Sequence, residues 1–223
     1  MKKVSTIIFL VISQFLLAQI TKNIENFTKV TAFDKISVQL IQSTENKVEL
    51  TGKFETDAEL INNNGELKIR LPIGYFLHGD NLVAKVYFKS LEAVEANEGS
   101  YVSCETEIKA LDFSIIAKEG AQIKVIINAD RITVKSSNGS VIKLSGKAQN
   151  LDVVTNSGGK LEAEKCITSQ TTVSVNAGGF ADVYATNLVD AKTRAGGTIT
   201  IYGNPKQVNK KNVFGGHIII SKQ

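Results

Sequence analysis

The C-terminal half of the chain repeats a short glycine-centred segment seven times: Glu98-Gly99-Ser100, Glu119-Gly120-Ala121, Asn138-Gly139-Ser140, Ser157-Gly158-Gly159, Ala177-Gly178-Gly179, Ala195-Gly196-Gly197 and Phe214-Gly215-Gly216. The first glycines of successive segments are 21, 19, 19, 20, 18 and 19 residues apart. So little scatter indicates an internal repeat, and a period near 20 residues is typical of stacked folds such as solenoids.

Apolar and polar residues alternate after each glycine. The positions three and five residues beyond it are apolar in all seven repeats, and the position between them is polar in six of the seven. The apolar positions are Val102, Ile123, Ile142, Leu161, Ala181, Ile199 and Ile218, followed by Cys104, Val125, Leu144, Ala163, Val183, Ile201 and Ile220. This period of two predicts a β-strand with one buried face after every glycine.

The residues before each glycine alternate as well. Five positions upstream the residue is apolar except at Lys210, and three positions upstream it is mostly small. The repeating unit is therefore strand, glycine turn, strand, and a second turn of variable length. Glycine is expected where the corner needs backbone angles closed to residues with a Cβ. Asn97, Asn156 and Asn176, two residues before the glycine, suit the same corner because Asn tolerates left-handed turns.

A unit of this length is too short to bury a core by itself, and stacking of similar units solves that problem. Because each column keeps its character over seven repeats, we predict an all-β, single-domain parallel β-solenoid with coils of about 19–20 residues, in which equivalent side chains lie roughly 4.8 Å apart. An antiparallel β-sandwich of hairpins is the alternative, since short strands with regular turns also indicate sandwiches.

The N-terminus predicts export. Met1-Lys2-Lys3 precedes an apolar stretch over residues 7–17, which is followed by Ala18-Gln19. This is typical of a secretory signal peptide at 1–19, and the apolar stretch is shorter than the roughly 20 residues that a membrane span needs. The remaining 20–223 would form the solenoid domain, with irregular N-terminal coils and a cap at 27–96 and seven regular glycine-turn rungs at 97–223. We expect an exported protein of the periplasm or the cell surface.

Composition narrows the function classes. The chain has 26 Lys and Arg against 22 Asp and Glu, and 43% hydrophobic residues. It is neither disordered nor a polytopic membrane protein, no later apolar run reaches transmembrane length, and the absence of a basic stripe argues against nucleic acid as a partner.

The sequence contains no motif for nucleophilic catalysis or for a metal site. The two histidines, His78 and His217, lie near no nucleophile motif, and no His or Cys cluster has ligand spacing, so we expect no catalytic triad, metal or cofactor. Cys104 lies in a core column, whereas Cys166 is placed near the outer turn, three rungs away. That separation is roughly 14 Å along the axis against the 7 Å or so that a disulfide allows, so no disulfide is predicted.

The order of several short motifs resembles a known family. Phe33-Asp34-Lys35-Ile36-Ser37-Val38, then Asn64-Gly65-Glu66-Leu67-Lys68-Ile69, then the Gly-Ser and Gly-Gly rungs are similar to the GIN-domain family over about 33–220. That family is described as an auto-transporter adhesin head domain, common in Bacteroidetes-type bacteria. The resemblance implies a β-helix-like exported protein with an adhesive or envelope role, and it supplies no catalytic residues.

One outward column carries the candidate site. Glu162 and Asp182 occupy the same position on adjacent rungs, with Tyr184 and Tyr202 two residues further along their strands. Two carboxylates about 5 Å apart is the separation found in retaining glycosidases, although stacked acidic residues on a solenoid reach it automatically. Aromatic faces flanked by polar groups instead suit sugars or a protein partner. The outward aromatic residues are Tyr101, Phe180, Tyr184, Tyr202 and Phe214.

These observations favour a non-enzymatic binding or adhesion module that recognises a glycan or an envelope protein. The first alternative is a structural envelope protein that self-associates through an open C-terminal edge, because Ile218-Ile219-Ile220 is apolar on both faces. The second alternative is a polysaccharide-active hydrolase or lyase that uses Glu162 and Asp182.

Overall fold

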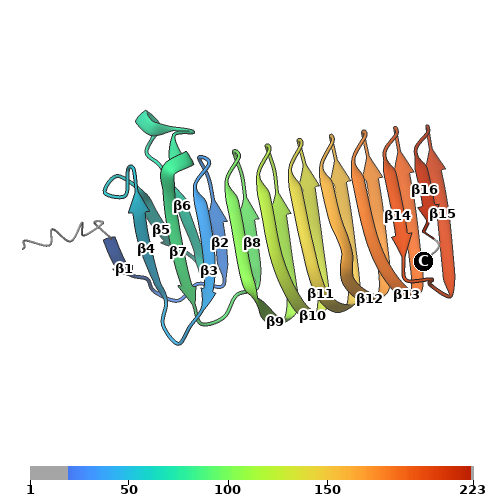
Figure 1. The fold of residues 1–223 in the computed structure, drawn as a ribbon, viewed down its shortest axis with the longest axis horizontal. Helices are drawn as coiled ribbons and strands as arrows, with labels where there is room; N and C mark the ends of the chain where they lie inside the picture. Colours follow the sequence, from blue (N-terminus) through green and yellow to red (C-terminus); the bar gives the residue numbers. More distant parts are fainter. Residues whose placement is uncertain (1–19, 222–223) are drawn as a thin grey trace, which may run out of the picture.

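The computed structural model describes residues 20–221, and the predicted signal peptide at 1–19 lies outside them. The described chain contains sixteen β-strands and two short 3-10 helices, and the strands form one sheet wound into an elongated solenoid (Figure 1). The predicted all-β parallel solenoid is confirmed, and the sandwich alternative is not favoured.

Five long strands each run through a whole coil from one glycine turn to the next. They are β9 (Tyr101–Ala117), β10 (Gln122–Ser137), β11 (Val141–Asn156), β12 (Lys160–Asn176) and β13 (Phe180–Arg194). The last coils are divided into β14 (Thr198–Tyr202), β15 (Gln207–Val213) and β16 (His217–Ile220). Neighbouring coils pair in parallel with equivalent residues in register, for example Ile123 with Ile142 and Leu161 with Ala181.

The glycine turns form one edge of the solenoid, at the top of Figure 1. In the first of them Ser100 N donates to Asn97 O at 3.0 Å, and the two central residues, Glu98 and Gly99, have φ of 54° and 70°. Two successive positive φ values identify a type I′ turn, which explains the glycine at the second central position. Each turn is tied to the next, since Gly99 N donates to Glu119 O at 2.9 Å.

The asparagines do not adopt the left-handed conformation expected of them. Asn97, Asn156 and Asn176 are the first residues of their turns, and the left-handed residue is the one that follows, Glu98, Ser157 or Ala177 in the three turns. Two of the asparagine amides serve the stacking instead: Asn176 Nδ2 donates to Asn156 Oδ1 of the preceding coil at 2.8 Å.

In the coils of the five long strands the opposite edge is not the separate second turn that the sequence predicted, although such a turn, residues 203–206, does separate β14 from β15. Each long strand bends there without leaving the hydrogen-bonded ladder, at the bottom of Figure 1. Register shifts lie near the bend, between Lys124 and Ile126 of β10 and between Ala163 and Ile167 of β12. These bulges absorb the drift in repeat length, because a bulge inserts a residue and bends the strand at once.

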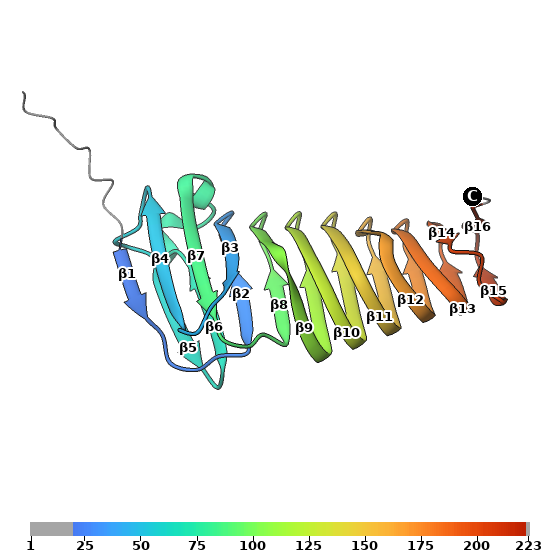
Figure 2. The same ribbon diagram turned by 60° about the horizontal axis from the view of Figure 1, so that its bottom comes forward.

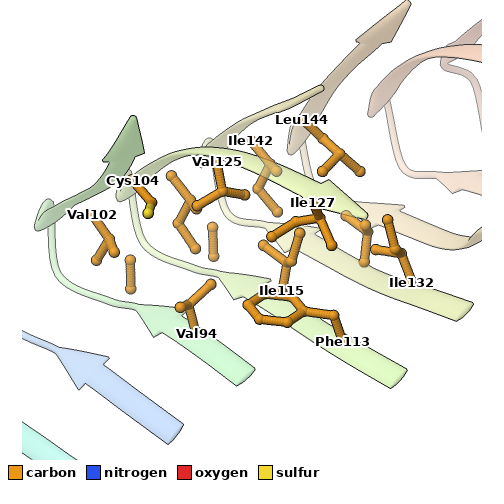
Figure 3. Close-up of a cluster of buried hydrophobic side chains, with 14 of the residues drawn as sticks. Val94, Val102, Cys104, Phe113, Ile115, Val125, Ile127, Ile132, Ile142 and Leu144 are labelled. Atoms are coloured by element: carbon orange, nitrogen blue, oxygen red, sulfur yellow. The ribbon is translucent and has the colours of Figure 1, made fainter. Parts of the chain in front are cut away.

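The core is a set of aliphatic columns between the two faces of each coil (Figure 3). The predicted inward columns are confirmed, because every member from Val102 to Ile201 is at most 2% exposed. At the last coil Ile218 is only partly buried and Ile220 is 41% exposed. Cys104 and Cys166 are buried free thiols. Cys166 is the register partner of Gly146, at the bend that takes the place of the predicted outer turn; its side chain points into the core, and burial raises the pKa of its thiol to about 12.

Residues 20–96, which we call the cap, contain eight short strands. They are β1 (Ile20–Asn23), β2 (Lys29–Ala32), β3 (Ser37–Gln42), β4 (Lys47–Gly52), β5 (Glu59–Asn63), β6 (Glu66–Arg70), β7 (Leu82–Phe88) and β8 (Ala93–Ala96). Their order in space differs from their order in the chain. β2 lies between β6 and β8, and β3 lies between β7 and β9.

The outer layer of the cap reverses the strand direction. β4 is antiparallel to β7, β1 is antiparallel to β4, and β5 is antiparallel to β6. Figure 2 shows β1 at this end of the molecule and β15 and β16 at the other. The division of the chain at residues 96 and 97 stays a prediction.

A chain of charges crosses the junction between the cap and the regular coils. Lys29 Nζ lies 2.9 Å from Glu66 Oε1 and 2.8 Å from Glu95 Oε2, and Lys118 Nζ lies 2.7 Å from Glu95 Oε1. Burial of Glu95 favours its neutral form, but hydrogen bonds from Lys118 and Lys29 outweigh burial and lower the pKa of the carboxyl. The four side chains therefore join β6, β2, β8 and the turn after β9.

Candidate functional site

The structure brings the predicted site residues together on the outward face that follows the glycine turns. Glu162 and Asp182 are register partners on β12 and β13, and Tyr184 and Tyr202 are register partners on β13 and β14. We call these four residues the outward ladder.

Lysines neutralise the Glu162 carboxylate. Lys160 Nζ lies 2.7 Å from Glu162 Oε1, and Lys143 Nζ lies 3.3 Å from Oε2. The hydrogen bond from Lys160 is the main reason why the pKa of Glu162 is lowered, and it raises the pKa of Lys160 in turn. A carboxyl held ionised in this way is unsuited to be the general acid of a glycosidase, which needs a raised pKa.

The tyrosines of the ladder are half-buried. A Cβ on Gly203 would lie 2.5 Å from Tyr184 Cε1, so this ring packs onto the backbone at Gly203. Burial raises the pKa of Tyr202, and the charges of Asp182 and Glu164 raise it further. The other outward aromatic residues are dispersed: Phe180 is 47% exposed beside one glycine turn, and Phe214 is 89% exposed in the last turn.

A second surface lies at the connection between β6 and β7, residues 72–81, which we call the tip loop. It contains the 3-10 helices η1 (Ile73–Tyr75) and η2 (Gly79–Asn81) and projects beyond the glycine-turn edge (Figure 1). Its large apolar side chains face solvent: Ile73 is 96%, Phe76 51%, Tyr75 39% and Leu77 37% exposed. No binding residue was predicted here from the sequence, in which the only signal is a run of apolar residues that does not alternate.

Asp34 holds the tip loop in place. Its side chain is almost fully buried, and its two carboxylate oxygens accept hydrogen bonds from Leu71 N at 2.9 Å and Leu77 N at 3.2 Å. Gly79 N donates to the main-chain oxygen of Asp34 at 3.0 Å. One residue of the β2–β3 turn thus fixes both ends of the loop. The Phe54 and Tyr75 rings, with centroids 4.6 Å apart, add a contact to the outer layer of the cap.

Two hollows flank Phe76. One of about 320 Å³ lies toward β6 and is lined by Phe33, Leu71 and Arg70 among others, with Glu98 at its edge. The other, of about 540 Å³, opens toward the glycine turns between Leu77, Glu98 and Glu119. Burial, and then the nearby charge of Asp34, raises the pKa of Glu98. The tip surface, defined as Ile73, Tyr75, Phe76 and Leu77 with these hollows, is therefore apolar at its centre and charged at its rim.

Other chemistry is sparse over residues 20–221. No group of three His, Cys, Asp or Glu side chains there is arranged to hold a metal ion. His78 lies in the tip loop with Nδ1 2.8 Å from Phe76 O, and His217 begins β16. No helix in this part of the chain is long and apolar enough to cross a membrane.

Comparison with known protein families identifies the chain. Residues 26–205 match the model of the family described as "Putative auto-transporter adhesin, head GIN domain". The chain belongs to the GIN-domain family. The matched residues of this GIN domain include the tip loop, the outward ladder and most of the regular coils.

Solved structures share the fold. A protein from Bacteroides fragilis described as a "putative adhesin" matches with a TM-score of 0.84 at 18% sequence identity. The match covers 93% of this chain and 98% of the Bacteroides fragilis chain. A second, from Parabacteroides distasonis, has a TM-score of 0.75 at 18% identity, covering 92% and 96%. A protein from the same species, titled "Putative lipid binding protein", has a TM-score of 0.68 at 16% identity, covering 92% and 97%. The GIN domain has no match among curated proteins.

Proposed function

We propose that this GIN domain is an exported, non-enzymatic binding module of the periplasm or cell surface, and that it contacts a protein partner through the tip surface. The observation that carries the proposal is the exposure of four large apolar side chains on one anchored loop. Isolated exposed apolar residues are ordinary, but a contiguous group with a charged rim is typical of an interaction site.

The chemistry of the tip surface supports a protein partner. Covering one large apolar side chain contributes about 1.5–3 kcal/mol, so Ile73 and Phe76 alone would supply an anchor for binding. Because Asp34 and the Phe54–Tyr75 contact fix the loop beforehand, little conformational entropy is lost when the partner binds. The rim carries charges of both signs, with Glu98 and Glu119 beside Lys35 in one hollow and Arg70 with Lys68 in the other, which suits a partner segment with polar side chains of either charge around its apolar ones.

Family membership supports a binding role over catalysis, and so does the outward ladder. Its Glu162 carboxylate is neutralised by two lysines, which suits a solvated strand face. A hydrolase would need an acid with a raised pKa and a partner carboxylate facing the same bond.

The test compares two exposed apolar sites. Purified 20–223 and the variants Ile73→Ser/Phe76→Ser and Leu111→Ser are titrated against envelope proteins extracted from Bacteroidetes-type bacteria. Leu111 is the matched control, because it is 75% exposed but lies at the bend of β9, on the opposite edge. We expect saturable binding that the tip variant loses and the control keeps. Binding that survives in the tip variant would contradict the proposal.

Glycan recognition by the outward ladder is the second candidate. It is favoured by the adjacency of Tyr184 and Tyr202 beside the charged side chains of Glu162, Asp182 and Lys160. A glycan array separates the candidates. Binding lost in Tyr184→Ala/Tyr202→Ala and kept in the tip variant would assign a glycan site to the ladder, and absence of binding to every glycan would reject it for the sugars tested.

A further inference from the structure

The two ends of the solenoid carry strand edges that have no partner within residues 20–221. β1 and β16 are the opposite edges of one face, with β1 paired only to β4 and β16 only to β14. On the other face β5 pairs only with β6, and β15 only with β13. Unpaired edges expose a row of N–H and C=O groups that can accept another strand.

The last coil differs in sequence from the earlier coils at positions where the end of the core meets solvent. Lys210 and Asn212 replace the aliphatic or small residues of the earlier coils, and both are exposed. Lys210 Nζ donates to Ile218 O at 3.2 Å, and Asn212 Nδ2 donates to Gly216 O at 3.3 Å. These polar groups cover the half of the core end that lies under β15.

The other half of this end stays apolar. In β16 Ile218 is only partly buried, Ile219 is 49% exposed and Ile220 is 41% exposed. His217 N donates to Gly197 O, just before β14, and Ser221 N donates to Ile201 O of β14, so the N–H groups of Ile218 and Ile220, at the alternate positions, point to the free edge. The edge therefore offers backbone hydrogen bonds together with apolar surface.

The two ends are complementary in charge. Among residues 203–221 the charged side chains are Lys206, Lys210 and Lys211, with no Asp or Glu. The segments of the cap that contain the free strands β1 and β5, residues 20–28 and 53–63, carry four acidic side chains against two basic ones. The acidic residues are Glu25, Glu55, Asp57 and Glu59, of which Glu59 is ion-paired with Arg70 of β6 at 2.7 Å, and the basic ones are Lys22 and Lys53. Apolar surface is present here too, because Leu60 is only partly buried and Ile61 is 37% exposed.

Strand directions also match. The pairings from β1 through β4, β7, β3 and the regular coils make β1 and β16 run in the same direction, and each is four residues long. β5 runs opposite to β15. A second copy placed end to end on the same axis would thus meet a parallel pairing on one face and an antiparallel pairing on the other.

We propose that copies of this chain associate head to tail, with the β15–β16 end of one copy on the β1–β5 end of the next. The interface is heterologous, so it leaves a free end after every addition and produces chains of increasing length rather than a closed dimer. This association uses the ends of the solenoid and is independent of partner binding by the tip surface.

Complementary charge reversals test the proposal. Lys206→Glu/Lys211→Glu makes the C-terminal end acidic, and Glu25→Lys/Asp57→Lys makes the cap end basic. All four side chains are exposed, and none forms an ion pair within the described residues. Lys124→Glu/Lys135→Glu, on exposed positions in the middle of the solenoid, is the matched control.

Sedimentation of purified 20–223 at low salt is the measurement. We expect the average mass of the unmodified chain to rise with concentration beyond the dimer, and to fall when salt screens the charges. Each end variant alone should stay monomeric, the control should associate, and an equimolar mixture of the two end variants should regain association. A chain that stays monomeric to about 1 mM, a mass that stops at the dimer, or a mixture that stays monomeric would overturn the proposal.

Discussion

In the regular coils each strand pairs in parallel with its equivalent in the next coil, whereas the cap interleaves its strands and reverses two of them, β4 and β5. Both regions bury similar aliphatic side chains almost completely, such as Ile142 in the coils and Leu67 in the cap. The two regions differ in what covers the end of their hydrophobic core. Every coil but the last is followed by another coil, but the cap must close the core, and antiparallel pairing lets the chain turn back across the open end.

The largest loss of stability is expected at two glycines, one in each region, that have the same backbone conformation and lie equally close to a neighbouring carbonyl group. Gly146 in the bend of β11 has φ +110°, and a Cβ there would overlap the carbonyl oxygen of Ile127. Gly52 in the cap has φ +111° and would overlap the carbonyl oxygen of Asn81. We expect Gly146→Ala and Gly52→Ala each to lower the free energy of unfolding by about 4 kcal/mol, or to prevent folding.

The matched control is Gly120→Ala in a type I′ turn. Gly120 has φ +72° and open space around it, so the expected loss is about 1 kcal/mol. Urea unfolding followed by circular dichroism measures all three variants. Equal losses at Gly146 and Gly120 would show that the close approach of the two backbones is not what requires glycine in the bend.

The second prediction concerns the anchor of the tip loop. Asp34→Ala removes the acceptor of two backbone hydrogen bonds, and loss of hydrogen bonds to a buried charged group costs about 2–3 kcal/mol. Limited proteolysis should then cleave within 72–81 before any cleavage in the regular coils. Cleavage that begins in the coils instead would mean that the loop is held by its other contacts.

The third prediction is a pH dependence located at the junction. The pKa of Glu95 is lowered in the folded chain, so its contribution to stability is present above the unfolded value near 4.5 and is lost as pH falls below that value. Glu95→Gln should cost about 1–2 kcal/mol at pH 7 and flatten the acid limb of the stability profile. A profile with the same acid limb in the variant would assign it to other carboxylates.

The smallest effect is expected on the tip surface. Ile73→Ser should change the free energy of unfolding by less than about 0.5 kcal/mol, because the side chain is 96% exposed. Ile142→Ser, buried in a core column, should cost several kcal/mol by comparison. A large loss at Ile73 would reveal a role in folding and weaken the case for a binding surface.

The same contrast explains what the sequence could predict. The columns through Ile123, Ile142 and Leu161 were predictable, because alternation over seven repeats fixes both the face and the partner. The continuous bend was not, because variable spacing looks the same for a loop and for a bulged strand. In the cap, the alternation of apolar and polar residues predicts β3 and β7 as strands, but it does not give the order of the strands in the sheet.

The candidate surfaces divide in a similar way. The positions of Glu162 and Asp182 side by side followed from the repeat, but the pairing of Glu162 with Lys160, two residues earlier on the same strand, depends on side-chain conformation that the repeat does not determine. The tip loop shows in the sequence only as a stretch in which apolar residues do not alternate. Its anchor, Asp34, lies almost 40 residues earlier in the chain, and only the fold brings the two together.

The interleaved cap also bears on how the protein would respond to mechanical force. When the two ends of the solenoid are pulled apart, the force acts along its axis, which is also the direction of the hydrogen bonds between coils. The coils should therefore detach one after another from the C-terminal end. Each coil of about 19 residues would release roughly 60–70 Å of chain. The sequence of small steps stops at β2 and β3, since these strands are held between β6 and β7 on one side and β8 and β9 on the other. The cap should therefore give way in a single larger event, acting as the last tether of a molecule that lengthens stepwise under load.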